Sequence, residues 1–394
     1  MLTLLNDFFA LLGIHWGPLR LFDYVTTRLV AALVTSFVLM LLAMPPLIRW
    51  LKRKKFGETG AKNQGAAVVD AMRDSKKGTP TMGGLGLVLC IAVTAFLWCD
   101  PQAPRTWLLI GGLLAFALLG FLDDRTKIFK GAKGTPLFVK LGIQLGAALG
   151  CGIALWLIEA HYAATLNPTG GVNYIKELPG GVFTVTLGTH QLALPFIGIH
   201  HALFLGVFSV CWTMFVTIAC ANGVNFTDGM DGLASGTMVI SALAFGVIAY
   251  LVGRVDSAQY LNVFYVPGGQ DVAIFCSAIA GACLGFLWFN CSPAEVFMGD
   301  TGSQALGGAL GLVALNTKQE FLVLLVGAVF VMEALSVALQ IASFRLRGGK
   351  RIFLCAPIHH HFQMQGWSET KIVIRFWIIA AGCALLAVAT LKIG

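Results

Sequence analysis

The stretch Leu113-Leu-Ala-Phe-Ala-Leu-Leu-Gly-Phe-Leu-Asp-Asp-Arg125 decides the fold, because an apolar run ends there on two adjacent carboxylates. Apolar runs of about 17 to 25 residues, the length that crosses a bilayer as a helix, recur along the whole chain. Of its 394 residues 57% are hydrophobic and only 12% are charged, which excludes a water-soluble domain. Backbone groups in lipid must be satisfied within the segment, so runs of this length predict helices rather than barrel strands. We therefore expect an all-α, polytopic membrane protein with a single domain over residues 1–394.

Ten membrane spans are predicted from the hydropathy pattern. They are 29–50, 82–99, 106–122, 137–159, 202–221, 233–252, 272–290, 305–316, 321–344 and 372–391, of which the eighth is short. With these spans, the loops on one side hold 18 of the 27 Lys and Arg residues and the other side holds seven. The positive-inside rule then predicts that the first set of loops is cytoplasmic and that both termini are periplasmic.

Other features of the sequence narrow the functional class. The segment Met1–Leu12 lacks a basic region and a cleavage site, so we expect mature sequence rather than a signal peptide. The ten cysteines form no CxxC pair, which argues against a disulfide framework or a zinc ribbon. No nucleic-acid-binding motif is present. In the long outer segment 162–199, the runs Val182–Leu187 and Gln191–Leu194 predict a small periplasmic β-hairpin over 182–195.

Carboxylates gather on the predicted inner face. Asp123 and Asp124 follow an apolar run directly, where two acids need cationic compensation. Arg125 and Lys127 could serve only as counter-ions, which leaves a structural interpretation open beside a metal or general-base site. Asn222, Asn225, Asp228 and Asp231 end another span, and Asp300 lies within Phe297-Met-Gly-Asp-Thr-Gly-Ser303. Five acids from three loops on one face predict a Mg²⁺ site, and hence a phosphate ligand.

Basic and histidine residues lie in the same loops. Ser75–Gly84 carries Lys76, and Lys133 follows the acid pair; both can hold phosphate oxygens, although positive-inside charge explains them equally well. Pro357-Ile-His-His-His361 lacks the spacing of a zinc site, so hydrogen bonding to phosphate or proton transfer is expected. Within the ninth span, Gln340 lies near the inner end, and Glu333 could be a protonated packing residue.

These motifs together resemble those of the polyprenyl-phosphate N-acetylhexosamine 1-phosphate transferases. The resemblance is carried by Asp123-Asp124, Asn222–Gly232, Phe297–Ser303 and Pro357–His361. Within that superfamily, Ser75–Gly84 and the triple His resemble the phospho-N-acetylmuramoyl-pentapeptide transferases. The likeness runs from about Thr26 to the C-terminus. The chain departs from the family at Gln363, where an acid is common, and in the expanded outer segment 162–199.

The resemblance implies ten transmembrane helices, a cytoplasmic site and a homodimer. It also implies transfer of phospho-MurNAc-pentapeptide from UDP-MurNAc-pentapeptide to undecaprenyl phosphate with Mg²⁺, which gives lipid I and UMP. Asp300 and Asp228 are the expected metal ligands, while Asp123 and Asp124 would place the lipid phosphate or take its proton. Uridine would contact Asp231, Asn290 and Phe297, whose ring would stack on uracil. The remaining expected substrate contacts are Lys76, Thr81, Lys133, Asn222, Asn225, Gln340, His359, His360 and His361.

Three other functions remain as alternatives. A sister enzyme that uses UDP-GlcNAc would share the metal chemistry but recognise a different sugar. A cation-coupled transporter would also carry acids in membrane helices, but near the bilayer midplane and in repeated halves. A non-catalytic scaffold would leave the set of aspartates unexplained.

Overall fold

The computed structural model describes residues 21–54, 78–130, 134–166, 173–178, 181–194 and 197–392. A helix overlaps each of the ten predicted spans. The long helices are α2 (Val25–Arg53), α4 (Gly84–Trp98), α5 (Pro104–Lys130), α6 (Leu137–Leu166), α7 (Phe208–Thr227), α8 (Leu233–Val252), α10 (Gly269–Asn290), α11 (Gly299–Asn316), α13 (Ala328–Leu346) and α15 (Glu369–Thr390). Within the described part of the chain, eight helices are long and apolar enough to cross a membrane, which supports a polytopic helical membrane protein.

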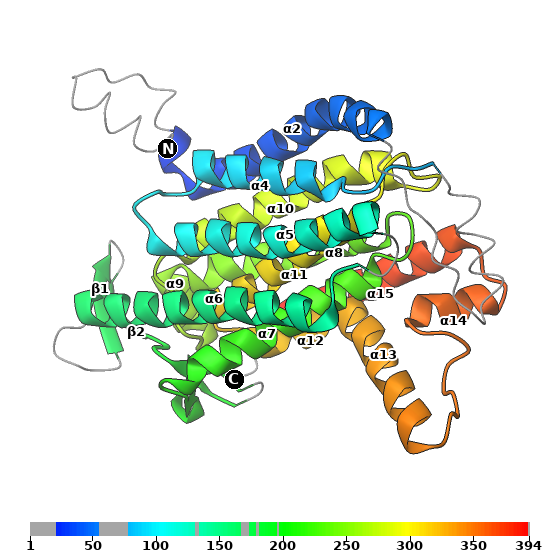
Figure 1. Ribbon diagram of the computed structural model, residues 1–394. Helices are drawn as coiled ribbons and strands as arrows, with labels where there is room; N and C mark the ends of the chain where they lie inside the picture. Colours follow the sequence, from blue (N-terminus) through cyan, green and yellow to red (C-terminus); the bar gives the residue numbers. More distant parts are fainter. Residues whose placement is uncertain are drawn as a thin grey trace.

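Two predicted spans differ from the structure. The eighth was expected to be short, but α11 has 18 residues because the polar stretch from Gly299 continues the same helix. The ninth was expected to be continuous over 321–344. Instead it consists of the 3-10 turn η3 (Glu320–Leu322), α12 (Val323–Val326) and α13, with a break at Gly327, which adopts a non-helical conformation. Figure 1 shows that α13 leaves the bundle at an angle after this break.

Helices α10 and α11 lie at the centre of the bundle. Helix α10 contacts α2, α8 and α4, and α11 contacts α5, α7 and α4. Every residue of α11 from Thr301 to Asn316 is buried, so its polar side chains must find partners within the protein.

The bundle has two ends, which Figure 1 shows at its two sides. We call the one where α5 and α7 end and α11 begins the acidic end, because the five aspartates lie there. At the opposite, hairpin end lie β1 (Asn173–Leu178), β2 (Gly181–Thr186) and α9 (Val255–Leu261). Helix α15 runs back from the short α14 (Ile358–Met364) to this end, where Lys392 lies over the ring of Tyr260.

The predicted hairpin over 182–195 is wrong in its pairing. Strand β2 covers the expected first run, but it pairs antiparallel with the preceding β1, whose polar residues gave no clear signal. Gln191–Leu192 forms β3 and pairs with β4 (Leu203–Phe204), beyond the predicted turn. The hairpin thus forms one strand earlier in the chain than expected.

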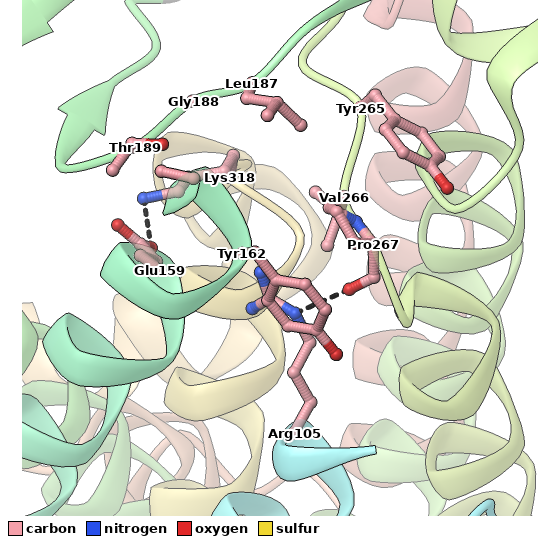
Figure 2. Close-up of a pocket in the computed structure, with 11 residues that line it drawn as sticks. Arg105, Glu159, Tyr162, Leu187, Gly188, Thr189, Tyr265, Val266, Pro267 and Lys318 are labelled. Atoms are coloured by element: carbon pink, nitrogen blue, oxygen red, sulfur yellow. Dashed lines mark hydrogen bonds and ion pairs between the residues drawn. The ribbon is translucent and has the colours of Figure 1, made fainter. Parts of the chain in front are cut away.

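A buried ion pair joins the loop after β2 to the helices. The pair consists of Glu159 of α6 and Lys318, which follows α11. Glu159 is 5% exposed and Lys318 is 6% exposed. The backbone N–H of His190 donates to Glu159 Oε2 at 2.7 Å. Arg105 of α5 donates to Pro267 O and Asn316 Oδ1, so one cluster ties α5, α6 and α11 together. Figure 2 shows Arg105, Glu159 and Lys318 among the residues around a cavity of about 20 Å³, which has room for water but not for an organic ligand.

Close packing of α5 on α11 brings the acid pair to the start of α11. Gly120 lies one turn before Asp123, and its Cα faces the backbone of Asp300 and Thr301. A methyl group there would overlap the Asp300 carbonyl, so only glycine permits this approach. On the same helix, Gly111 faces open space.

The Glu159→Ala variant tests the cluster at the hairpin end. The change leaves Lys318 buried without its carboxylate, which costs about 3–5 kcal/mol. We expect a clearly lower midpoint in thermal unfolding of the detergent-solubilised protein. The control, Asp256→Ala, breaks the exposed Arg254–Asp256 pair and should cost about 1 kcal/mol or less. Equal midpoints for the two variants would contradict a stabilising role of the buried Glu159–Lys318 pair.

The Gly120→Ala variant tests the contact between α5 and α11. The added methyl must push the two backbones apart, so we expect a destabilisation of about 1–3 kcal/mol, typical of overpacking. Gly111→Ala makes the same chemical change on the same helix without a clash. Its midpoint should stay at or above that of the unmodified protein, and a common response of both variants would rule out close packing as the cause.

Candidate active site at the acidic end

Two carboxylates and two ammonium groups meet at the acidic end. Lys127 Nζ lies 3.0 Å from Oδ2 of both Asp123 and Asp300. Lys140 Nζ lies 3.1 Å from Asp123 Oδ2 and 2.8 Å from Asp300 Oδ2. The same oxygen of each aspartate therefore contacts both cations, so the two carboxylates converge on one place. Asp123 is buried, while the Asp300 side chain keeps 13% of its surface exposed.

Asp124 anchors the start of α11. Its Oδ1 accepts from the backbone N–H of Asp300 at 3.0 Å, and its Oδ2 accepts from the backbone N–H and the hydroxyl of Thr301 at 2.9 and 2.6 Å. Backbone donors at a helix N-terminus have no partner within the helix and favour negative charge. Asp124 thus fixes the position of Asp300, a structural role that its place beside Asp123 did not reveal.

The segment after Gly78 pairs with the Phe297 motif. Phe297 N–H donates to Pro80 O, and Gly83 N–H donates to Phe297 O, both at 2.9 Å. Thr81 is half-buried, and its hydroxyl lies beside Gly299 and hence near Asp124 Oδ2. The Phe297 ring is half-buried and accessible to a ligand. Lys76 and Lys133, two expected phosphate contacts, lie outside the described residues.

Hydrogen bonds hold the end of α7 against α11 and α6. Ser303 Oγ donates to Asn225 Oδ1 at 3.0 Å, and Asn222 Nδ2 donates to Ile218 O and, at 3.5 Å, to Gln144 Oε1. Helices α7 and α11 pack side by side, and α7 ends beside the start of α11. Asp228 lies three residues after Asn225, and Asp300 lies three residues before Ser303. Both acids are therefore about one helical turn from the Ser303–Asn225 hydrogen bond, on the side of the acidic end.

Asn290 and Asp231 connect two loops rather than face solvent. Asn290 Oδ1 accepts from Gly232 N–H and Ser235 Oγ, and its Nδ2 donates to Val296 O. Asp231 Oδ2 accepts from Ala294 N–H at 3.2 Å. Both side chains are buried. These contacts set the position of Phe297, which lies one residue beyond Val296.

The three consecutive histidines begin the short helix α14 and have different surroundings. His359 is fully buried, and its Nδ1 lies 3.1 Å from Glu333 Oε2. His360 is half-buried, with Nδ1 at 2.7 Å from Gln363 Oε1. His361 Nδ1 accepts from the backbone N–H of Leu354. His360 and His361 are thus the two histidines of the three that keep part of their surface exposed.

Gln340 is engaged with the same loop as His361. Its Oε1 accepts from the backbone N–H groups of Ile352 and Phe353, and its Nε2 donates to Phe353 O. The predicted substrate contacts Gln340 and His361 therefore both fix residues 352–354, whereas Asp123, Asp300 and Thr81 lie together.

Sequence reasoning missed several polar residues of the site. Lys140 was recognised only as a cation within a span, although an intramembrane charge requires a partner and its partners are the acids of interest. Gln144 and Gln304 form a hydrogen bond at 3.3 Å that links α6 to α11. Glu369, in the first turn of α15, accepts from Asp231 N–H at 2.8 Å. None of these pairs has a local sequence spacing that could have disclosed it.

No group of three or more His, Cys, Asp or Glu side chains with metal-site geometry occurs among the described residues. Mg²⁺ does not need one, because it binds through one or two carboxylates together with water and substrate phosphate. Asp123 and Asp300 already direct one oxygen each to a common place that cations occupy. Their oxygen-only donor set is of the kind that Mg²⁺ prefers.

Comparison with known proteins agrees with this arrangement. Residues 105–318 match the family described as Glycosyl transferase family 4. A phospho-N-acetylmuramoyl-pentapeptide-transferase of Desulfotalea psychrophila is 42% identical over 375 residues, which are 95% of each chain. The enzymes of that name from Solidesulfovibrio magneticus and Ruegeria pomeroyi are 40% and 43% identical and cover 96% and 95% of this chain, and 97% and 96% of their own length.

Similarity of this extent runs over almost the whole length of both chains. The chain belongs to the family of phospho-N-acetylmuramoyl-pentapeptide-transferases.

Proposed function

We propose that this protein transfers phospho-MurNAc-pentapeptide from UDP-MurNAc-pentapeptide to undecaprenyl phosphate, which yields lipid I and UMP. The observation that carries the proposal is the convergence of Asp123 and Asp300 on Lys127 and Lys140 at one end of a membrane helix bundle. A reaction between two phosphate anions needs both charge neutralisation and positioning, and this cluster can supply both. The full-length relatives support the choice of sugar over the sister reaction with UDP-GlcNAc.

Mg²⁺ is proposed as the cofactor, with Asp300 and Asp228 as its ligands. When bound, it would neutralise the pyrophosphate of the nucleotide and stabilise the departing UMP. Asp300 is suited to this role because it is partly exposed and its backbone is fixed by Asp124. Lys127 and Lys140 lie against the Asp300 carboxylate and can turn toward substrate phosphate oxygens.

The other residues of the acidic end take their roles from their positions. Asp123, held between two lysines, is placed to orient the lipid phosphate or to accept its proton. The half-buried ring of Phe297 offers a stacking surface for uracil, and Asp231 and Asn290 hold the loops on either side of it. We favour direct attack by the lipid phosphate; a phosphosugar-enzyme trapped without lipid would favour a covalent intermediate instead.

A groove beside α13 is proposed to admit the lipid. Its volume is about 340 Å³, and its lining comprises Val337, Gln340, Ile341, Phe344, Arg345, Arg351, Cys355 and Ala356. Apolar side chains suit a polyprenyl chain, and the two arginines suit its phosphate at the headgroup level.

The charge distribution further supports a cytoplasmic acidic end, periplasmic termini and a place in the bacterial inner membrane. A homodimer and ten spans are proposed from the family resemblance.

The alternative of a cation-coupled transporter fits less well. Transport acids are expected near the bilayer midplane, whereas these lie where α5 and α7 end and α11 begins.

The reaction is tested by UMP release from purified protein in detergent with undecaprenyl phosphate and Mg²⁺. UDP-MurNAc-pentapeptide should be turned over and UDP-GlcNAc should not. EDTA should abolish turnover, and added Mg²⁺ should restore it. Asp300→Asn should lose about 100-fold or more of kcat, since a charged group at the reacting phosphates is removed.

The control for this experiment is Asp256→Asn, which removes an exposed carboxylate at the hairpin end and should leave turnover unchanged. Turnover of UDP-GlcNAc would identify the sister enzyme. Full activity of Asp300→Asn, or no release of UMP from either nucleotide by folded protein, would refute the proposed reaction.

A further inference from the structure

A glutamate inside a membrane helix has one histidine as its partner. Glu333 of α13 is completely buried, and its Oε2 lies 3.1 Å from Nδ1 of His359. Neither carboxylate oxygen has a well-aligned hydrogen bond among the described residues, so the 3.1 Å approach of His359 Nδ1 is the close polar contact that Glu333 makes there. A carboxylate without a partner is costly at this depth, so the contact with His359 has to compensate its burial. Glu333 is therefore more than the packing residue that its sequence context allowed.

The other edge of the same imidazole faces the loop after α7. His359 Nε2 is buried, has no hydrogen-bond partner in the described part of the chain, and lies against Gly229. A methyl group at Gly229 would overlap the ring, so the absence of a side chain there makes room for it. Gly229 directly follows Asp228, a proposed metal ligand. His359 consequently links α13 to the loop that presents the acids.

His359 also contacts the next histidine. The ring centroids of His359 and His360 are 4.1 Å apart, at an interplanar angle of 60°. His360 is half-buried, and its Nδ1 lies 2.7 Å from Gln363 Oε1, so its ring is fixed on two sides. An error in the orientation of His359 would therefore displace both the Gly229 backbone and His360.

We propose that Glu333 is a positioning residue for the transfer reaction, acting through His359. In this inference the carboxylate, 3.1 Å from Nδ1, is the acceptor toward which the ring turns its Nδ1–H, and it thereby fixes the ring orientation and the tautomer, as carboxylates do for histidines in many active sites. His359 holds the Asp228–Asp231 loop and His360 in place. This inference rests on the proposed function, and it corrects the expectation that His359 itself contacts substrate.

Steady-state kinetics of the full-length protein in detergent test the proposal. Glu333→Leu removes the acceptor, and we expect kcat to fall about 10- to 100-fold, the usual effect of losing an orienting partner. Glu333→Gln keeps an oxygen for Nδ1–H and should recover at least tenfold relative to Leu. The matched control, Leu335→Ala, changes an exposed position of the same helix and should leave kcat unchanged.

A second variant approaches the same contact from the loop. Gly229→Ala keeps Glu333 but places a methyl group against the His359 ring, and it should lower kcat as Glu333→Leu does. It serves the test even if the leucine variant fails to fold. Unchanged kcat in both Glu333→Leu and Gly229→Ala would overturn the inference.

Nuclear magnetic resonance gives a readout that does not depend on turnover. With ¹⁵N-labelled histidine, the His359 signals are those missing from His359→Gln. They should show Nδ1 protonated in the unmodified protein and a changed tautomer mixture in Glu333→Leu. Equal spectra would refute the pairing even where kcat falls. Failure of the unmodified, folded protein to release UMP would remove the proposed function, whereas normal turnover with unaffected variants would remove this inference alone.

Discussion

Two carboxylates can lie together at the end of a membrane helix only if cations lie between them. Here Lys127 and Lys140 each contact both Asp123 and Asp300, and the rest of the acidic end is arranged around that contact. Two ammonium groups offset two carboxylates, so the cluster is close to neutral without a ligand. A phosphate and a metal ion can enter together with little change in total charge, which is less costly than burying either one alone.

The cluster depends on how closely three helices approach one another. Asp124 binds the first N–H groups of α11, and Gly120 lets the α5 backbone lie directly against them. Lys140 enters from the start of α6. The charged cluster therefore belongs to the closely packed part of the bundle. The loops that carry Phe297 and Asp231 are held beside it by the hydrogen bonds of Asn290 with Gly232 and Val296. Preorganisation of this kind is what phosphoryl transfer needs from a protein.

The sequence predicted the class of fold well because lipid imposes a simple rule on length and polarity. All ten apolar runs became helices, and the acids in three distant loops do lie at one end of the bundle. The break at Gly327 was missed because hydropathy does not register a local change of backbone conformation. The pairing of β1 with β2 was missed because a polar strand has weak alternation. The partners of Asp123, Asp124 and Glu333 are set by the packing of helices far apart in sequence, which no local pattern encodes. The placement of His359 beside Gly229 belongs to the same class of long-range contact.

Helices α5, α6 and α11 are tied together at both ends, by Arg105, Glu159 and Lys318 at one and by Asp123, Lys140 and Asp300 at the other. A helix that is held by polar contacts at one end can unfold locally from the other end. A helix that is held at both ends can unfold only when the contacts at both ends are lost together. These three helices should therefore exchange their amide hydrogens as one cooperative unit, with the slowest rates in the chain. Helix α13 leaves the bundle after Gly327 and, apart from the adjoining α12, makes its main contacts with α7, α14 and α15, so its outer half should exchange faster than this central unit.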